Sequence, residues 1–321
     1  MADDVLLQLD RVGKTFRSGL LGRRVEAVRE VSLTLRRGES VGYLGPNGSG
    51  KTTSIKCILS LIQPSRGAIR LFGKPPSDAL ARARVGYLPE SPYFYDYLTP
   101  HEVLDYVGRL YGIDRGTRKK RVPMLLDRLG LAQAMHRPLR GFSKGMLQRV
   151  GIAQSLLSDP DLLIYDEPLS GLDPIGRKEV RELMVDLRKE GKSLFFSSHV
   201  LTDIETLCDS VCILDRGVAV AQGRLSELLL ADRLESEAVI ELAADAQEAA
   251  IAVLTSVPGA VLCERAGAVV RLRVPTPRVP ELTQCALEVQ AQLRELAPRR
   301  DSLEELFMRK AVHVQEVGGA A

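Results

Sequence analysis

The 321-residue chain has no tryptophan, and none of its five cysteines forms a Cys-x-x-Cys pair. An odd number of unpaired cysteines argues against a disulfide framework or a zinc site and indicates a reducing compartment. No window reaches the roughly 18 apolar residues that a membrane-spanning helix needs. The first residues, MADDVLLQLD, lack the basic start and apolar run of a signal peptide. These absences predict a cytoplasmic chain that is soluble by itself.

Charge of one sign is not in excess either. The chain carries 44 Lys and Arg side chains against 41 Asp and Glu, a formal net charge of +3. That balance argues against a protein that binds nucleic acid by electrostatic attraction. A local basic run at 115–121 is compatible with a solvated helix face, or with contact to anionic lipid or an acidic partner. With no internal repeat and no heptad insertion, the length suits one α/β core and a second, smaller domain.

Strand-like and helix-like segments alternate up to about residue 231. Alternating apolar and polar residues predict paired strands at 5–16 and 27–39 and a closing hairpin at 211–223. Apolar runs predict buried strands at 39–45, 84–90, 161–168 and 193–199. A helix is predicted between the last two of these strands, at 176–190. The pattern therefore predicts a largely parallel core joined to antiparallel strands.

A helical insert is expected at about 91–158, within this core. Its first helix has the residues of a capping box, with Thr99 as the cap, Pro100 at the first helical position and Glu102 at the third. The insert and the strands around it form the first predicted domain, residues 1–231.

The composition changes near residue 232, where a second domain, residues 232–321, is predicted. Its pattern indicates strands at 236–244 and 267–274 and helices at 246–257 and 280–296, in alternating order. A further helix is indicated near the end, at 301–312. The domain is therefore expected to be a small α+β unit without nucleotide motifs.

The first sequence with recognisable chemistry is a phosphate loop, which lies between a predicted strand and a predicted helix. It fits G-x-x-x-x-G-K-[ST] and comprises Gly45, Pro46, Asn47, Gly48, Ser49, Gly50, Lys51 and Thr52, followed by Thr53. Glycines allow backbone N–H groups to surround phosphate oxygens, and Lys51 adds charge near the β and γ phosphates. The Thr52 hydroxyl can bind Mg²⁺. The loop predicts binding of a nucleotide.

An Asp-Glu pair ends the apolar strand LLIYDEP. Asp166 is placed to hold magnesium, directly or through water. Glu167 beside it could orient and deprotonate an attacking water. Such a pair by itself is also compatible with a helix cap, and the phosphate loop favours the catalytic interpretation.

A second anion-binding helix start lies at 141–150, GFSKGMLQRV. Together, GPNGSGKTT, FSKGMLQR, LLIYDEP, SGLD at 170–173 and His199 have the order and spacing of an ATP-binding-cassette (ABC) ATPase. This resemblance covers about residues 5–230. It implies a P-loop NTPase cassette with an antiparallel β subdomain and a helical insert, in addition to the small C-terminal α+β domain.

The resemblance implies that two cassettes pack head to tail, so that the second helix start of one chain closes over the ATP of the other. Ser143, Lys144, Gly145 and Met146 would form that signature segment. His199 would contact the γ-phosphate in its own chain, Asp173 would reach across the interface, and Phe16 would stack on adenine. Catalysis is thus expected from Lys51, Glu167 and His199 in a closed homodimer or heterodimer, with ATP and Mg²⁺ bound.

Two positions depart from the usual cassette pattern. Lys144 and Met146 replace the glycine and glutamine of LSGGQ, and Glu90 stands where most cassettes have glutamine. These variants, and the SLEELF sequence near the end, resemble the branch that powers export-type permeases. The Glu90 carboxylate adds a negative charge that the glutamine amide would lack. This charge would alter any contact of the position with the bound metal.

The resemblance implies an ATPase subunit on the cytoplasmic face of the membrane, bound to an integral membrane permease that supplies the substrate path. An aromatic cluster follows Glu90 and consists of Tyr93, Phe94, Tyr95 and Tyr97. It is expected to receive a permease helix. Its rings could instead pack at the base of the helical insert.

Two rival functions fit the sequence less well. A soluble cassette ATPase acting on ribosomes or nucleic acid would usually carry two cassettes or a long coiled coil. A small-molecule P-loop kinase would leave FSKGMLQR and SGLDP unexplained.

Overall fold

The structure, a computed structural model, describes residues 4–18, 23–229, 235–243, 247–298 and 303–304. The chain divides into two compact units, the first running to Leu225 and the second from Ser226 to Arg309. This division falls a few residues before the predicted boundary at 231. Each unit is described by itself.

The first unit is built on a nine-stranded sheet. In hydrogen-bonding order, its strands are β4 (Arg66–Leu71), β1 (Val5–Ser18), β2 (Arg23–Arg36), β9 (Val218–Arg224), β8 (Ser210–Asp215), β3 (Ser40–Leu44), β7 (Ser193–Ser198), β6 (Leu162–Tyr165) and β5 (Val85–Leu88). Strands β8, β3, β7, β6 and β5 pair in parallel, whereas β1 pairs with β2 and β4 antiparallel. The largely parallel core is therefore confirmed. The sequence patterns did not predict β4.

Strands β3, β6 and β7 are buried along their whole length. Helices pack on a parallel sheet and shield both of its faces, so such strands are mostly apolar rather than alternating. The buried serines of β3 and β7, Ser40, Ser193, Ser197 and Ser198, are the exceptions. Four helices accompany these strands: α1 (Lys51–Ile58), α2 (Ala79–Ala83), α6 (Pro174–Lys189) and α7 (Leu201–Leu207). The carboxyl ends of parallel strands meet at one edge of a sheet, which is where α/β proteins bind their ligands.

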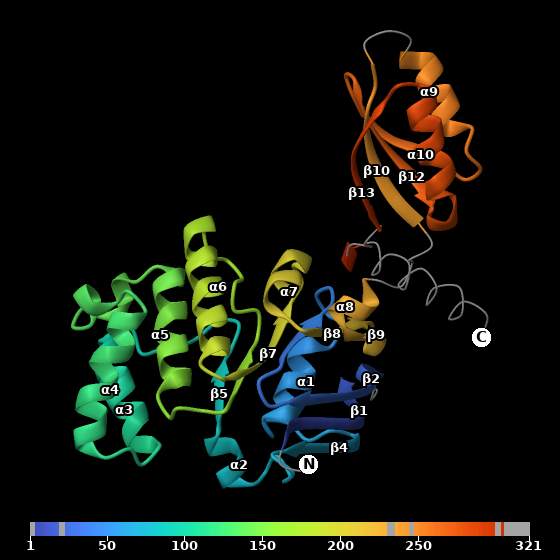
Figure 1. The fold of residues 1–321 in the computed structure, drawn as a ribbon. Helices are drawn as coiled ribbons and strands as arrows, with labels where there is room; N and C mark the ends of the chain where they lie inside the picture. Colours follow the sequence, from blue (N-terminus) through green and yellow to red (C-terminus); the bar gives the residue numbers. More distant parts are fainter. Residues whose placement is uncertain (1–3, 19–22, 230–234, 244–246, 299–302, 305–321) are drawn as a thin grey trace. The chain divides into compact units, whose positions relative to one another are not determined.

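The helical insert contains α3 (Pro100–Leu110), α4 (Arg115–Arg128) and α5 (Lys144–Leu156), which lie together in green in Figure 1. The predicted capping box is confirmed: the Thr99 hydroxyl accepts a hydrogen bond from the Glu102 N–H at 3.2 Å, and the Thr99 N–H donates to the Glu102 carboxylate at 2.8 Å. Two short 3-10 helices, Ala132–Ala134 and Leu139–Gly141, connect α4 to α5.

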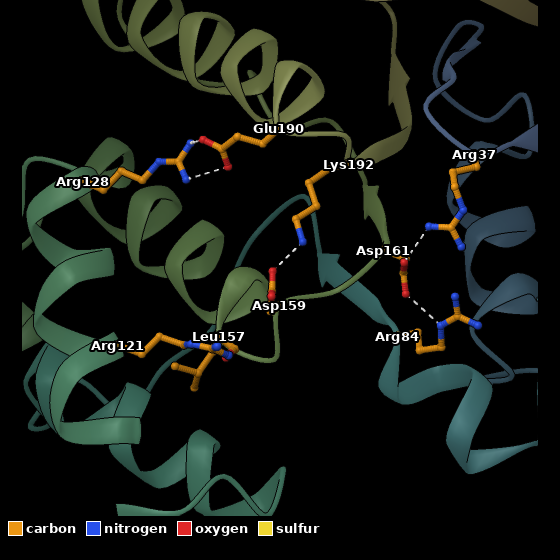
Figure 2. A network of polar contacts seen from close by, with 9 residues as sticks. All are labelled: Arg37, Arg84, Arg121, Arg128, Leu157, Asp159, Asp161, Glu190 and Lys192. Carbon is orange, nitrogen blue, oxygen red and sulfur yellow. Dashed lines mark hydrogen bonds and ion pairs between the residues drawn. The ribbon is translucent and has the colours of Figure 1, made fainter. Parts of the chain in front are cut away.

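Polar contacts connect the segments that precede β6 and β7 with neighbouring helices and with the turn after β2 (Figure 2). Asp161, just before β6, accepts hydrogen bonds of 2.8 Å from both Arg37 and Arg84. The guanidinium of Arg84, and then that of Arg37, holds the pKa of this carboxyl below its usual value. Further contacts join Lys192 to Asp159, Arg128 to Glu190, and Arg121 to the carbonyl of Leu157.

The second unit has the order β10 (Glu235–Glu241), α9 (Gln247–Thr255), β11 (Val261–Ala266), β12 (Val269–Pro275), α10 (Val279–Glu288) and β13 (Gln292–Pro298). Its antiparallel sheet has the order β11-β12-β10-β13. This is the βαββαβ arrangement of ferredoxin-like folds. Figure 1 shows α9 and α10 on one face of the sheet, where alternate residues of β10 and β12 are buried.

One prediction for this unit is wrong. The helix expected at 280–296 ends at Glu288, and Gln292–Pro298 forms β13 beside β10. Gln290 adopts a left-handed φ of 54°, which breaks the helix, and the following residues gain backbone hydrogen bonds from β10. The exposed strand β11 was also not predicted, because its residues lack a buried face. The helix expected at 301–312 lies, apart from Leu303 and Glu304, outside the described residues.

Candidate functional site

The phosphate loop joins β3 to α1, so it starts at the carboxyl end of a central strand and ends at a helix N-terminus. Gly50 has a φ of 106°, and a Cβ atom there would lie 2.4 Å from the carbonyl oxygen of Ala27. A Cβ at Gly45 would lie 2.5 Å from the carbonyl oxygen of Leu214. Only glycine allows this path, which leaves the first N–H groups of α1 available for an anion.

Lys51 is the first residue of α1 and is 6% exposed. Its ammonium donates to the carbonyls of Gly45 at 2.6 Å and Pro46 at 3.3 Å, which holds the side chain along the loop. It also forms an ion pair of 3.1 Å with Oε1 of Glu167. The loop cation and the predicted general base are therefore in direct contact.

Asp166 and Glu167 follow β6 and are 1% and 7% exposed. Glu167 has a left-handed φ of 49°, which is uncommon for a residue other than glycine. The N–H of Glu167 donates to the hydroxyl of Ser197 at 2.9 Å, and that hydroxyl donates to Oδ1 of Asp166 at 2.6 Å. Ser197 on β7 thus connects the two acidic residues.

His199 follows β7 at the same edge of the sheet. Its Nδ1 lies 2.8 Å from Oε2 of Glu167, and its side chain is 44% exposed. Glu167 therefore lies between Lys51 on one carboxylate oxygen and His199 on the other. An ammonium, a carboxylate and an imidazole are therefore in direct contact at this edge of the sheet.

Lys51 and Glu167 border a cleft of about 480 Å³. It is lined by Ala27, Pro46, Asn47, Gly48, Gly50, Lys51, Thr52, Thr53, Glu90 and Glu167. The cleft brings together residues from four distant segments, including the predicted Glu90 position. Phe16 does not appear among the described residues that line it. Its ring is 39% exposed on β1, and the Lys14 ammonium lies 5.1 Å from the ring centroid.

The signature segment begins α5. The Ser143 side chain caps this helix by accepting from the N–H of Met146 at 3.3 Å, and Ser143 and Lys144 are exposed. A Cβ at Gly171 would lie 2.2 Å from the Lys144 ammonium, so Lys144 extends across the SGLD segment. Asp173 of that segment caps α6 by accepting from the N–H of Gly176 at 2.7 Å. Both predicted trans-acting segments therefore lie at exposed helix starts.

Comparisons with known proteins agree with this geometry. A family model described as "ABC transporter" matches residues 28–170. A solved structure of the ATP-binding subunit of an ABC transporter is 34% identical, with a TM-score of 0.62 over 70% of this chain and 91% of that one. The chain belongs to the ABC transporter ATP-binding family. This confirms the predicted cassette fold.

Two curated ABC relatives are similar to about two thirds of this chain. An uncharacterized ABC transporter ATP-binding protein of Synechocystis sp. is 48% identical over 221 residues, 68% of this chain and 62% of that protein. The Nod factor export ATP-binding protein I of Ralstonia nicotianae is 39% identical over 201 residues, 62% of this chain and 63% of that protein. The chain thus spans less than two thirds of the length of both relatives.

The oxygen donors near the cleft suit a magnesium ion. The Thr52 hydroxyl and the Asp166 carboxylate are hard ligands, and Mg²⁺ is commonly held by one or two such groups together with substrate phosphates. Among the described residues, no group of three or more His, Cys, Asp or Glu could hold a metal. A magnesium site completed by substrate phosphates does not need three such side chains.

Burial dominates the electrostatics around the site. Burial, and after it the charge of nearby Asp166, raises the pKa of Tyr87 to about 12. Burial also raises the pKa of Asp203 on α7, against the opposing effect of Arg177 and Arg181. The carboxyl edge of the sheet is therefore a weakly solvated environment in which charges interact strongly.

The aromatic segment after Glu90 lies on the surface. Tyr93, Tyr95 and Tyr97 are 89%, 61% and 67% exposed, and the rings of Tyr95 and Tyr97 lie 5.7 Å apart. Phe94 is half-buried. For the three tyrosines the rival interpretation, packing at the base of the insert, does not hold. Within the described parts of the chain, no helix is long and apolar enough to cross a membrane.

Sequence reasoning missed two polar residues near the site. Ser197 was read only as part of an apolar strand, although a serine pair directly before His199 is an unusual end to such a strand. Gln148 of α5 is buried and donates to the carbonyl of Pro168 at 3.0 Å. It connects the signature helix to the segment after Glu167. A polar residue on the buried face of a helix was the available signal.

Proposed function

We propose that this chain is the ATP-hydrolysing subunit of an ABC exporter. The observation that supports it best is the convergence of Lys51, Glu167 and His199 beside the phosphate-loop cleft. The chain holds a cation for the phosphates, a carboxylate for the water and an imidazole for the γ-phosphate. ATP is the substrate, and hydrolysis would supply the energy for transport.

Hydrolysis follows from the roles of these groups. The loop N–H groups and Lys51 bind the β and γ phosphates and neutralise the charge that develops there. Glu167 accepts a proton from the attacking water, and His199 orients that carboxylate and the γ-phosphate. When bound, Mg²⁺ would be held by Thr52 and Asp166 and would supply further charge neutralisation. Release of Glu167 from Lys51 accompanies phosphate binding, because phosphate oxygens compete for the same ammonium.

The complete site is proposed to need two chains packed head to tail. Ser143, Lys144, Gly145 and Met146 would bind the γ-phosphate of the partner's ATP at the start of α5, and Asp173 would cross the interface. The exposure of both helix starts supports this arrangement, because neither belongs to the cleft of its own chain. The partner is a second copy or a related cassette.

Export through a separate membrane permease is the proposed biological role. It is supported by the name of the Nod factor export relative, by the signature Lys144 and Met146, and by Glu90. The chain would then be peripheral on the cytoplasmic face, held by the permease. The aromatic surface formed by Tyr93, Phe94, Tyr95 and Tyr97 is the proposed contact, and Phe16 the proposed adenine contact.

The residues after about 231 are proposed to be a separable accessory module. Its ferredoxin-like order and its own core support this, because that core can be buried without the cassette. The module would tune dimerisation or regulation rather than hydrolysis.

A phosphate-release assay on the purified chain with Mg²⁺ and ATP tests the proposal, beside Lys51→Ala as the inactive control. Co-purification with a six-helix membrane protein encoded nearby tests the transport role. Absence of ATP hydrolysis by the folded wild-type chain, alone and with that partner, would overturn the proposal.

A further inference from the structure

Ser197 occupies a central place beneath the site without lining the cleft. Its strand, β7, lies between β3, which leads to the phosphate loop, and β6, which leads to Asp166. The β6–β7 register ends with Tyr165 opposite Phe196, so the next residues of the two strands, Asp166 and Ser197, are neighbours. Ser197 is 0% exposed.

The Ser197 hydroxyl makes two different hydrogen bonds. It donates its proton to Oδ1 of Asp166 at 2.6 Å and accepts the N–H of Glu167 at 2.9 Å. A hydroxyl has one donor and two acceptor sites, so a single group can serve both residues. Alanine can do neither, and cysteine does both weakly.

The two bonds have separate consequences. The first fixes the orientation of the Asp166 carboxylate, because a strong charge-assisted bond occupies one of its oxygens. The second holds the Glu167 N–H while that residue adopts its left-handed φ of 49°. This backbone turn aims the Glu167 side chain between Lys51 and His199.

We propose that Ser197 is a positioning residue for ATP hydrolysis: its hydroxyl fixes the metal-binding Asp166 and the general base Glu167 together. The role rests on the proposed function, since it presumes that these two residues act on magnesium and water. Ser197 itself does not line the cleft, so it acts through Asp166 and Glu167. Metal affinity and hydrolysis therefore depend on Ser197, whereas contacts of the phosphate loop with nucleotide do not.

The test compares the full-length wild type with Ser197→Ala and Ser197→Cys. Binding of Mn²⁺ in the presence of ADP is measured by electron paramagnetic resonance, and ADP affinity is measured separately in EDTA. Loss of a hydrogen-bonding partner of a metal ligand weakens metal binding by about tenfold or more. We expect that loss in Ser197→Ala and a smaller one in Ser197→Cys, with unchanged ADP affinity in EDTA and a lower kcat.

Ser193→Ala is the matched control. Ser193 lies at the other end of β7, is also 0% exposed, and accepts the N–H of Gly38 at 2.8 Å. Its loss removes a part-buried hydrogen bond of the same strand, far from the acidic pair. We expect Ser193→Ala to lower thermal stability while Mn²⁺ affinity stays at the wild-type value.

The possible results distinguish failure of the proposed function from failure of the positioning role alone. A wild-type chain that neither hydrolyses ATP nor binds Mn²⁺ with ADP contradicts the proposed function itself. An active wild type whose Ser197→Ala variant matches Ser193→Ala in Mn²⁺ affinity contradicts only the positioning role. If Ser197→Ala does not fold, Ser197→Cys decides, and unchanged Mn²⁺ affinity in that variant overturns the role.

Discussion

The ammonium of Lys51 lies 3.1 Å from Oε1 of Glu167, and both side chains are almost completely buried. The same carboxylate contacts His199 through its other oxygen. Glu167 is thus held by two groups that are both proposed to bind the γ-phosphate. These proposed roles link nucleotide binding to activation of the base through shared contacts.

Replacing Glu167 by glutamine is expected to lower ATP turnover by about 100-fold or more, because an amide cannot accept the proton from water. ATP binding is expected to persist, since the amide no longer competes as an anion for Lys51. The variant should therefore accumulate as an ATP-dependent dimer in size-exclusion chromatography. Glu182→Gln, an exposed change on α6, should behave as wild type. Near-normal phosphate release by Glu167→Gln would assign the base to another residue.

Mixing two inactive variants tests the head-to-tail dimer. Lys51→Ala damages the phosphate loop and Ser143→Arg damages the signature segment, so each homodimer has two defective sites. A random mixture should recover roughly a quarter of the wild-type rate, because half of the dimers carry one intact site of two. Phosphate release is measured against mixing ratio. Normal activity in Ser143→Arg alone would show that the segment does not act on the partner's ATP.

A chain ending at residue 231 is expected to fold and to bind ATP with wild-type affinity. The first unit contains the whole phosphate-loop cleft and its own core, whereas the second has a separate core. Fluorescent nucleotide binding and circular dichroism provide the measurement, with Lys51→Ala in the same truncation as control. A folded truncation without nucleotide binding would contradict a separable module.

The double change Tyr95→Ser and Tyr97→Ser is expected to weaken permease assembly and transport several-fold. Both rings are exposed, and aromatic residues contribute strongly to interfaces. Basal ATPase activity should stay within about threefold, because neither ring lines the cleft. Pull-down of the permease and the ATPase rate are measured together, with Tyr106→Ser, 57% exposed on α3, as control. Intact assembly in the double variant would place the contact elsewhere.

Asp161→Asn is expected to lower the free energy of unfolding at pH 7 by roughly 1 kcal/mol, a modest value because Arg84 is 42% exposed. The pKa of Asp161 is lowered in the folded chain, chiefly by Arg84. Its contribution is therefore present above the unfolded pKa of about 3.9 and is lost as pH falls through the folded value.

Denaturation at a series of pH values checks this expectation for Asp161. The difference between wild type and Asp161→Asn should decrease steadily as pH falls below about 3.9, while Asp186→Asn, an exposed change on α6, should be near neutral throughout. A difference that does not decrease with falling pH would assign the effect to packing rather than to charge.

Local sequence signals predicted the parts of the fold that depend on neighbouring residues. The capping box of Thr99 and Glu102 and the phosphate loop involve contacts within a few positions, so their residue types specify the geometry. The cassette fold followed from the resemblance of the motifs, in their order and spacing, to ABC ATPases. The ion pair of Lys51 with Glu167 joins segments more than a hundred residues apart, and only the folded sheet brings them into contact.

Pairing between distant strands explains the errors. β13 was predicted as helix because its leucines continue the spacing of α10, and its partner β10 lies far earlier in the chain. Ser197 was overlooked for a similar reason: its importance comes from its place opposite Asp166 in a neighbouring strand, not from a motif. Residues whose role depends on strand register cannot be identified from local patterns.

Strand β6 has four residues, Leu162–Tyr165, and is fixed at both ends. Asp161 anchors its beginning through Arg37 and Arg84, and Asp166 bonds to Ser197 just after its end. The distance between these anchors is therefore set by the number of residues, about 3.3 Å for each. Leucine, isoleucine and valine are interchangeable in such a segment at modest cost, whereas inserting or deleting one residue would turn Asp166 away from its partner. The position of Asp166 therefore depends more on the length of this segment than on its composition.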